Sequence, residues 1–170
     1  MILLGLGSNL DSSFGDRFKN IDLAIEALIE TGIIIIKKSS YYESASYPNK
    51  NNPKFINIVA SIDTKLSPEN LASILIFVEK SLERKRGKKN DPRTCDIDII
   101  DFNSEVKIFT YKNHKFIVPH KNLAFRNFVL YPLQEILPKW THPQTKESIK
   151  SLISKLDDDS KKSILKLNKS

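Results

Sequence analysis

The stretch 91-DPRTCDIDII-100 places two aspartates, Asp96 and Asp98, one residue apart in an apolar run, with Arg93 just ahead of them. In a β-strand, alternate side chains face the same way. Both carboxylates would then project from one face, about 6.5–7 Å apart at the backbone. Carboxylates that close repel each other unless a cation lies between them. The run therefore requires a positively charged partner.

Two kinds of partner suit this pair. Hard oxygen ligands suit Mg²⁺, which usually takes one or two carboxylates and completes its shell with water and substrate phosphates. Two such ions about 4 Å apart would form the clamp used in phosphoryl transfer. Alternatively, Asp96 and Asp98 pair with Arg93 or nearby lysines at a solvated sheet edge. The spacing alone leaves both alternatives open.

A compact basic cluster precedes the aspartates. Residues 80–93 hold seven Lys or Arg against Glu83 and Asp91, within a chain of net charge +7. Such a cluster predicts a polyanionic partner, either nucleic acid or the phosphates of a nucleotide. Arginine suits bidentate phosphate contacts, and lysine supplies point charge. A solvated loop is the alternative, but this loop adjoins a carboxylate pair whose metal ions would themselves need phosphate ligands.

The pattern of apolar residues predicts the elements that position these groups. In chain order they are a strand (2–7), a helix (14–31), a strand (33–42), a polar loop (43–54), a strand (55–64), a helix (67–84) and a strand (94–102). This β-α-β-β-α-β order predicts an α+β, ferredoxin-like fold, with two helices on one face of a four-stranded, mostly antiparallel sheet. A hairpin (105–118), a helix (123–136) and a polar C-terminal segment complete the prediction.

Gly5 and Gly7 lie two residues apart on the first strand, which neighbours the last strand in this fold. Missing side chains there would leave room for a ligand beside the aspartates. A bulge or a tight strand end is the alternative. The string G-x-G-S-N is not a dinucleotide fingerprint, because the third glycine is absent.

Composition bounds the class of protein. A chain of 170 residues with 28% charged and 40% hydrophobic residues is typical of a soluble, single-domain globular protein. Its one cysteine, Cys95, excludes an intrachain disulfide and fits a reducing compartment such as the cytoplasm. No apolar run approaches the roughly 18 residues of a membrane span, and the apolar N-terminal run is typical of a strand, not of a signal peptide.

Six motifs together resemble the 6-hydroxymethyl-7,8-dihydropterin pyrophosphokinase family of folate synthesis. They are 7-GSNL-10, 42-YES-44, 55-FIN-57, 92-PRTCDIDII-100, 118-VPH-120 and 126-RNFVLYPL-133. They keep the family's order and approximate spacing from residue 1 to about 143. PRT-x-D-x-D is highly specific, VPH followed by R-x-F moderately so, and GSNL alone is weak. The resemblance implies a pyrophosphokinase domain over 1–143, with 144–170 as its polar extension.

The resemblance also implies the reaction and the roles of residues at matching positions. A pyrophosphoryl group would pass from ATP to the pterin's hydroxymethyl oxygen, releasing AMP, with two Mg²⁺ ions held by Asp96 and Asp98. The implied catalytic residues are Arg84, Arg93, Asp96 and Asp98. The implied ATP-binding residues are Glu79, Arg84, Arg86, Arg93, Ile100, His120 and Arg126. Loop 84–91 would close over ATP.

The implied pterin-binding residues are Ser44, Ala45, Tyr47, Phe55, Asn57 and Phe128. Phe55 and Phe128 would stack on the ring, and Asn57 would hydrogen-bond its edge. From the residues alone, core packing is the alternative for both phenylalanines, and a structural hydrogen bond is the alternative for His120. The chain departs from the family at Asn90-Asp91, where Trp-Gly is frequent, at Glu83 (often Gly), at Ile76 (often Gln) and in the segment ASYPNK.

Two other functions compete with this interpretation. A ferredoxin-like RNA-binding module would also suit a basic chain, but no RNP-like aromatic string appears, and aspartates on an open sheet face repel phosphate. A paralogue that only binds pterin is disfavoured by the intact PRTCDID string. We expect small-molecule partners only, ATP and the pterin, with no nucleic acid and no membrane, and a cytoplasmic monomer.

Overall fold

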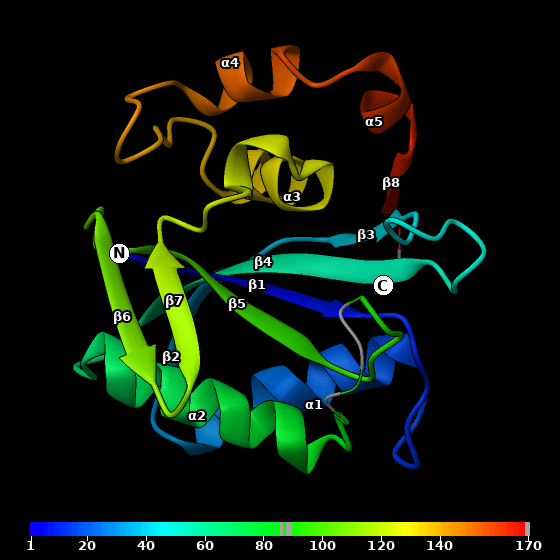
Figure 1. The fold of residues 1–170 in the computed structure, drawn as a ribbon, viewed down its shortest axis with the longest axis vertical. Coiled ribbons are helices and arrows are strands. Elements are labelled where there is room, and N and C mark those ends of the chain that lie inside the picture. Colours follow the sequence, from blue (N-terminus) through cyan, green and yellow to red (C-terminus); the bar gives the residue numbers. More distant parts are fainter. Residues whose placement is uncertain (86, 88–89, 169–170) are drawn as a thin grey trace.

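In the computed structural model, which describes residues 1–85, 87 and 90–168, six strands form one antiparallel sheet (Figure 1). The strand order is β5-β1-β4-β3-β8. Strand β2 also pairs with β4, next to residues 60–63, whereas β3 pairs with residues 55–57. The strands are β1 (Ile2–Ser8), β2 (Ile34–Lys38), β3 (Tyr41–Ser44), β4 (Phe55–Asp63), β5 (Asp96–Phe102) and β8 (Ile164–Leu167). A separate hairpin consists of β6 (Lys107–Tyr111) and β7 (His114–Val118).

Helices cover both faces of the sheet (Figure 1). On one face lie α1 (Arg17–Glu30) and α2 (Pro68–Ser81). On the other lie the short 3₁₀ helix η1 (Leu123–Phe125), α3 (Asn127–Ile136) and α4 (Ile149–Ser154), followed by α5 (Asp158–Lys162). Helices α1 and α2 begin at side-chain caps, since Asp16 accepts from the Lys19 N–H and Ser67 from the Asn70 N–H. None of the helices in the described ranges is long and apolar enough to cross a membrane.

Each face of the sheet has its own apolar cluster. Alternate β1 residues divide between them: Leu4 packs with α1 and α2, whereas Leu3 packs with α3 and α4. Both side chains are fully buried. The core strands are therefore apolar on both faces, which explains why their sequences are continuous hydrophobic runs and not alternating ones.

The predicted βαββαβ core is confirmed, including the two helices on one face, but the sheet is larger than the four strands expected. The 33–42 strand divides into β2 and β3, because the Ser39 hydroxyl accepts the Val59 N–H that would otherwise join the ladder (3.0 Å). The C-terminal segment adds β8, paired with β3. It also adds Ile149, Leu152 and Leu156 to the α3–α4 cluster. The tail is thus part of the core and not only a polar extension.

A β-bulge interrupts the alternation of β5. Leu4 of β1 pairs with Ile99, but Leu3 pairs with Asp101, so Ile100 is the extra residue. As a result, Ile100 and Asp101 both contact the α3–α4 side. Ile100 joins the apolar cluster. Asp101, fully buried, accepts hydrogen bonds from the Trp140 indole N–H (2.9 Å) and from the Ser104 N–H (2.8 Å).

We predict that Trp140→Phe lowers the free energy of unfolding by about 1–3 kcal/mol, because Asp101 Oδ2 loses its donor inside the core. Urea unfolding followed by circular dichroism would measure this, since Trp140 is the chain's single tryptophan and its fluorescence would be lost. Adding Asp101→Asn to Trp140→Phe should recover part of the lost free energy of unfolding. A buried neutral amide that lacks one hydrogen-bond partner destabilises the fold less than a buried carboxylate that lacks one. A Trp140→Phe variant with the wild-type urea midpoint would contradict the prediction.

Candidate active site

Asp96 and Asp98 stand opposite the two glycines of β1. In the β1–β5 register Gly7 pairs with Asp96, and Gly5 pairs with Asp98. Ile97 and Ile99 between them pack on the α1–α2 side. The two carboxylates therefore project together from the other face, as the alternation predicted.

Both aspartates are paired with arginines. Asp96 Oδ1 lies 2.5 Å from Arg84 Nη1, and Asp96 Oδ2 lies 3.2 Å from Arg93 Nη1. Asp98 Oδ2 accepts from Arg126 Nη1 at 2.9 Å, with His120 Nε2 4.0 Å away. Arginine pairing, one of the two alternatives left open by the sequence, is thus what the structure shows, and Arg93 is one of the partners.

Glu79 extends this network into α2. Its Oε1 lies 2.6 Å from Arg84 Nη1 and accepts the Ile97 N–H at 2.8 Å. Burial would by itself raise the pKa of Asp96, but the charges of Arg84 and Arg93 outweigh it and hold that pKa below its ordinary value. Burial would lower the pKa of Arg84, but Asp96 and Glu79 raise it. The ion pairs therefore stay charged.

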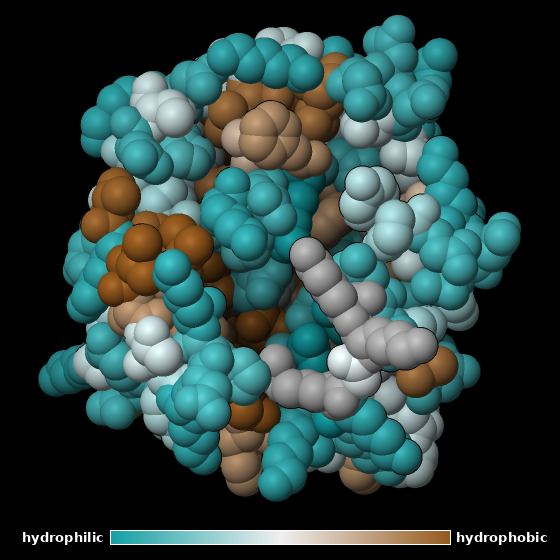
Figure 2. Space-filling model, viewed as in Figure 1, coloured by the Kyte–Doolittle hydropathy of each residue, from teal (hydrophilic) through white to brown (hydrophobic). Residues whose placement is uncertain are grey.

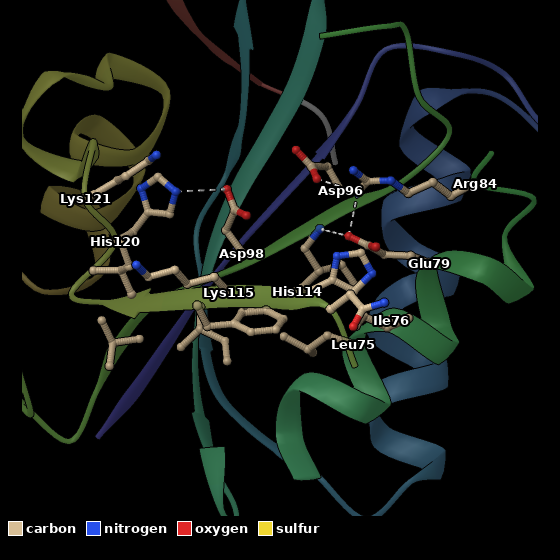
Figure 3. A pocket seen from close by; sticks show the side chains of 16 residues that line it. Leu75, Ile76, Glu79, Arg84, Asp96, Asp98, His114, Lys115, His120 and Lys121 are labelled. Atoms are coloured by element: carbon tan, nitrogen blue, oxygen red, sulfur yellow. Dashed lines mark hydrogen bonds and ion pairs between the residues drawn. The ribbon is translucent and has the colours of Figure 1, made fainter. Parts of the chain in front are cut away.

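A cavity of about 360 Å³ opens beside these carboxylates, between α2, β5 and β7. Figure 3 shows Arg84, Glu79 and Asp96 grouped at one side of it, and His120 with Asp98 at another. Its wall also carries apolar residues of α2 and β7 and two lysines: Leu75, Ile76, Phe116, Lys115 and Lys121. Figure 2 shows that this face of the molecule is hollowed near its centre, where hydrophilic and hydrophobic surfaces meet. The cavity thus joins a charged region to an apolar slot.

Asn57 lies on the other side of β1 from Asp96. Its Nδ2 donates to the Ser44 hydroxyl (2.9 Å) and to the Tyr42 carbonyl (3.4 Å), so these bonds fix the orientation of the amide. A Cβ on Gly7 would lie 3.2 Å from Asn57 Oδ1. The oxygen therefore occupies the space that the glycine leaves open.

The two candidate stacking residues each lie beneath an arginine of the site. The Arg93 guanidinium carbon is 5.7 Å from the centre of the Phe55 ring, and that of Arg126 is 5.4 Å from the centre of the Phe128 ring. Both rings are partly exposed, which distinguishes them from residues packed wholly in the core.

The other candidates are placed as follows. Ala45 is half-buried and Tyr47 is 81% exposed, both in the segment after β3. Ile100 lies on the same face as the two aspartates, as the alternation predicted, and packs in the α3–α4 cluster. Ile99, and not Ile100, is among the residues that line the cavity. Arg86 lies outside the described residues.

Asn9 is a site residue that the sequence reasoning missed. It is almost fully buried, its Oδ1 accepts the Arg93 N–H (2.8 Å), and its own N–H donates to the Arg93 carbonyl (3.1 Å). Its Nδ2 donates to the Pro53 carbonyl (3.0 Å). The GSNL motif contained this signal, but only the structure shows that its Asn anchors the PRT segment. Lys115 and Lys121 also line the cavity and were missed. Lys115 lies in the hairpin, where no motif was recognised, but Lys121 directly follows the VPH motif.

Fold and site define an α+β protein whose paired carboxylates and arginines suit a polyphosphate. Comparison with known proteins then identifies the family: residues 3–138 match 7,8-dihydro-6-hydroxymethylpterin-pyrophosphokinase (HPPK). The chain belongs to this family. The match gives no support to the RNA-binding alternative.

The similar proteins include both short and long chains. The 2-amino-4-hydroxy-6-hydroxymethyldihydropteridine pyrophosphokinase of Aquifex aeolicus is 39% identical over 149 residues, which cover 88% of each chain. The folic acid synthesis protein fol1 of Pneumocystis carinii is 36% identical over 96% of this chain but only 21% of its own length. This chain thus spans about a fifth of that longer relative. Crystalline Plasmodium falciparum HPPK-DHPS shares the fold, with a TM-score of 0.69 and 16% identity over 91% of this chain and 44% of that one.

We predict that Asp98→Asn lowers the pKa of His120 further. Burial already holds this pKa below its ordinary value, and the charge of Asp98 acts in the opposite direction, so removing that charge removes the opposition. An NMR titration of the imidazole resonances would measure the change. His142 is an internal control, because its carboxylate neighbours are Asp101 and Glu147. A rise in the pKa of His120 would contradict the assignment.

Proposed function

We propose that the chain transfers a pyrophosphoryl group from ATP to the hydroxymethyl oxygen of 6-hydroxymethyl-7,8-dihydropterin and releases AMP. The observation that carries this proposal is the placement of Asp96 and Asp98 on one face of β5, paired with Arg84, Arg93 and Arg126 beside a cavity. Phosphoryl transfer depends mainly on positioning and on stabilising charge, which such a group of residues supplies.

The donor set fits Mg²⁺. The Asp96 and Asp98 side chains are 27% and 37% exposed, so their oxygens are reachable. Among the described residues, no group of three or more His, Cys, Asp or Glu could hold a metal ion. A pair of carboxylates suits ions that bring phosphate ligands with them. We propose that these aspartates hold two Mg²⁺ ions, which when bound neutralise phosphate charge and acidify the attacking hydroxyl.

The arginines can exchange partners when a metal-bound polyphosphate arrives. Each guanidinium now neutralises a carboxylate, and a half-buried charge left alone would be costly. A polyphosphate with its cations supplies a new partner to both sides at once, so no charge is left unpaired. Arg84 and Arg93 then stabilise the charge that develops on the phosphoryl oxygens, and Arg126 and His120 hold the nucleotide.

Asn57 and the two rings supply the pterin site. Asn57 pairs with Gly7 in the β1–β4 register, and Gly7 pairs with Asp96 in the β1–β5 register. A ring whose edge bonds Asn57 therefore extends toward the carboxylates. Phe55 and Phe128 stack on it, and the segment after β3 (44–47) contacts its edge. The apolar part of the cavity accepts the adenine, with Glu79 nearby.

The wider expectations of the sequence remain part of this proposal. Residues 1–143 and the extension 144–170 act as one domain, which is supported by the tail residues in the α3–α4 cluster. The chain works as a cytoplasmic monomer on two small molecules, without nucleic acid or membrane. The single cysteine, buried and free, suits a reducing compartment.

The test is to incubate the protein with MgATP and hydroxymethyl-dihydropterin and to separate the nucleotides. AMP is expected, because the β- and γ-phosphoryl groups of ATP are transferred together to the pterin. ADP, or no pterin-dependent turnover, would contradict the proposal. Asp98→Asn should lower turnover by about 100-fold or more. An unchanged urea midpoint would show that this variant is folded.

We predict that Gly7→Ala raises the KM for the pterin about 10-fold, equivalent to about 1.4 kcal/mol, and changes the KM for ATP much less. The new Cβ would lie 3.2 Å from Asn57 Oδ1 and 3.5 Å from Phe55 Cδ1, both in the pterin site. Steady-state kinetics with each substrate varied would measure the effect.

Gly5→Ala is the matched control, two residues away on the same strand. Its Cβ would meet only the flexible end of Ile100, also at 3.2 Å, inside the core. It should leave the KM for the pterin unchanged. Equal increases in both variants would contradict the role given to Asn57.

A further inference from the structure

Glu83, directly before Arg84, has a backbone conformation that side chains disfavour. Its φ is +63°, in the left-handed region that glycine adopts at little cost. In this chain the Glu83 carboxylate accepts two hydrogen bonds from Ser13, from its N–H (2.9 Å) and its hydroxyl (2.5 Å). The contact holds Glu83 in the disfavoured conformation.

Ser13 is a fixed point because its loop is attached to α1. Asn20, fully buried in α1, donates to the Leu10 carbonyl (3.0 Å) and accepts the Ser12 hydroxyl (2.6 Å). Ser12 and Gly15 also exchange backbone hydrogen bonds across the turn. A contact with Ser13 therefore ties the end of α2 to α1.

The loop between β1 and α1 (9–16) also holds Arg93. Asn9 of this loop makes two hydrogen bonds with the Arg93 backbone, and Ser13 makes two with the Glu83 carboxylate. The guanidinium groups of Arg84 and Arg93 then meet at the two oxygens of one carboxylate, Asp96. One loop thus fixes the backbone beside both arginines.

We propose that the Ser13–Glu83 contact positions Arg84 for the transfer, an inference that rests on the proposed function. Glu83 determines the direction in which the chain leaves α2, and the next N–H, that of Arg84, donates to the Glu79 carbonyl (3.1 Å). Without the contact, Glu83 relaxes toward an ordinary φ and Arg84 turns away from Asp96. Glu83 is a positioning residue, since its carboxylate is bound to Ser13 and not directed to the substrates.

The test compares substitutions at Glu83. Glu83→Ala removes the contact and should lower kcat about 10-fold, because small displacements of a catalytic group are costly. Glu83→Gly also removes the contact but should keep most of the wild-type kcat, because glycine adopts this φ at little cost. The KM for the pterin should stay within about twofold, since Asn57 and Phe55 are untouched. Glu83→Gln keeps an acceptor for Ser13 and should keep most of the wild-type kcat. Wild-type kcat in Glu83→Ala, or the full loss in Glu83→Gln, would overturn the proposal.

A matched control and a second measurement separate this proposal from the proposed function. Glu147, just before α4, makes a similar contact, because its carboxylate accepts the Ser151 hydroxyl (3.3 Å). Glu147→Ala removes this contact and should not change kcat. Amide hydrogen exchange at Arg84 should speed up in Glu83→Ala and stay unchanged in Glu147→Ala. If the wild type forms no AMP, the proposed function fails, while unchanged exchange at Arg84 refutes the positioning role.

Discussion

The site depends on one row of residues across three strands. Asn57 of β4, Gly7 of β1 and Asp96 of β5 stand side by side in the two antiparallel registers. Directly opposite residues project from the same face, so an amide and a carboxylate face the same space, about 9.5 Å apart at the backbone. The glycine between them keeps that space open. A Cβ at position 7 would lie 3.2 Å from Asn57 Oδ1 and 3.5 Å from Phe55 Cδ1, so it would crowd both side chains.

Charge balance is the second constraint. Three carboxylates, Glu79, Asp96 and Asp98, line one cavity together with Arg84 (Figure 3). Arg93 pairs with Asp96, and Arg126 pairs with Asp98. Each ion pair offsets the desolvation of its members. The charges of Arg84 and Arg93 hold the pKa of Asp96 below its ordinary value, and Asp96 and Glu79 raise the pKa of Arg84. For the function proposed above, a site made only of arginines would lack metal ligands, and one made only of aspartates would repel phosphates.

Local patterns were enough to predict the strand that carries the aspartates, the βαββαβ order and the capped start of α2 at Ser67. They failed where distant pairing decides. Period-two alternation assumes an unbroken ladder and would place Asp101 with Ile97 and Ile99 on the α1–α2 side. The bulge in β5 turns Asp101 to the α3–α4 side instead, where Trp140 donates to it. The β8 strand is four residues long and stable only through β3. Nothing in its own sequence specifies that pairing.

For the arginines too, the sequence predicts which residues matter but not where they lie. Arg84 and Arg93 are recognisable in the sequence as phosphate-binding candidates, but the sequence does not show that both pair with Asp96. In the structure, Glu83 and Arg93 are hydrogen-bonded to Ser13 and Asn9, 70 and 84 residues earlier. Asn9 also donates to the Pro53 carbonyl, just before β4, which carries Phe55 and Asn57. A buried asparagine that makes three such bonds, two through its side chain and one through its backbone N–H, cannot shift without breaking one of them. The backbones that carry the two halves of the site are therefore tied together at the end of β1.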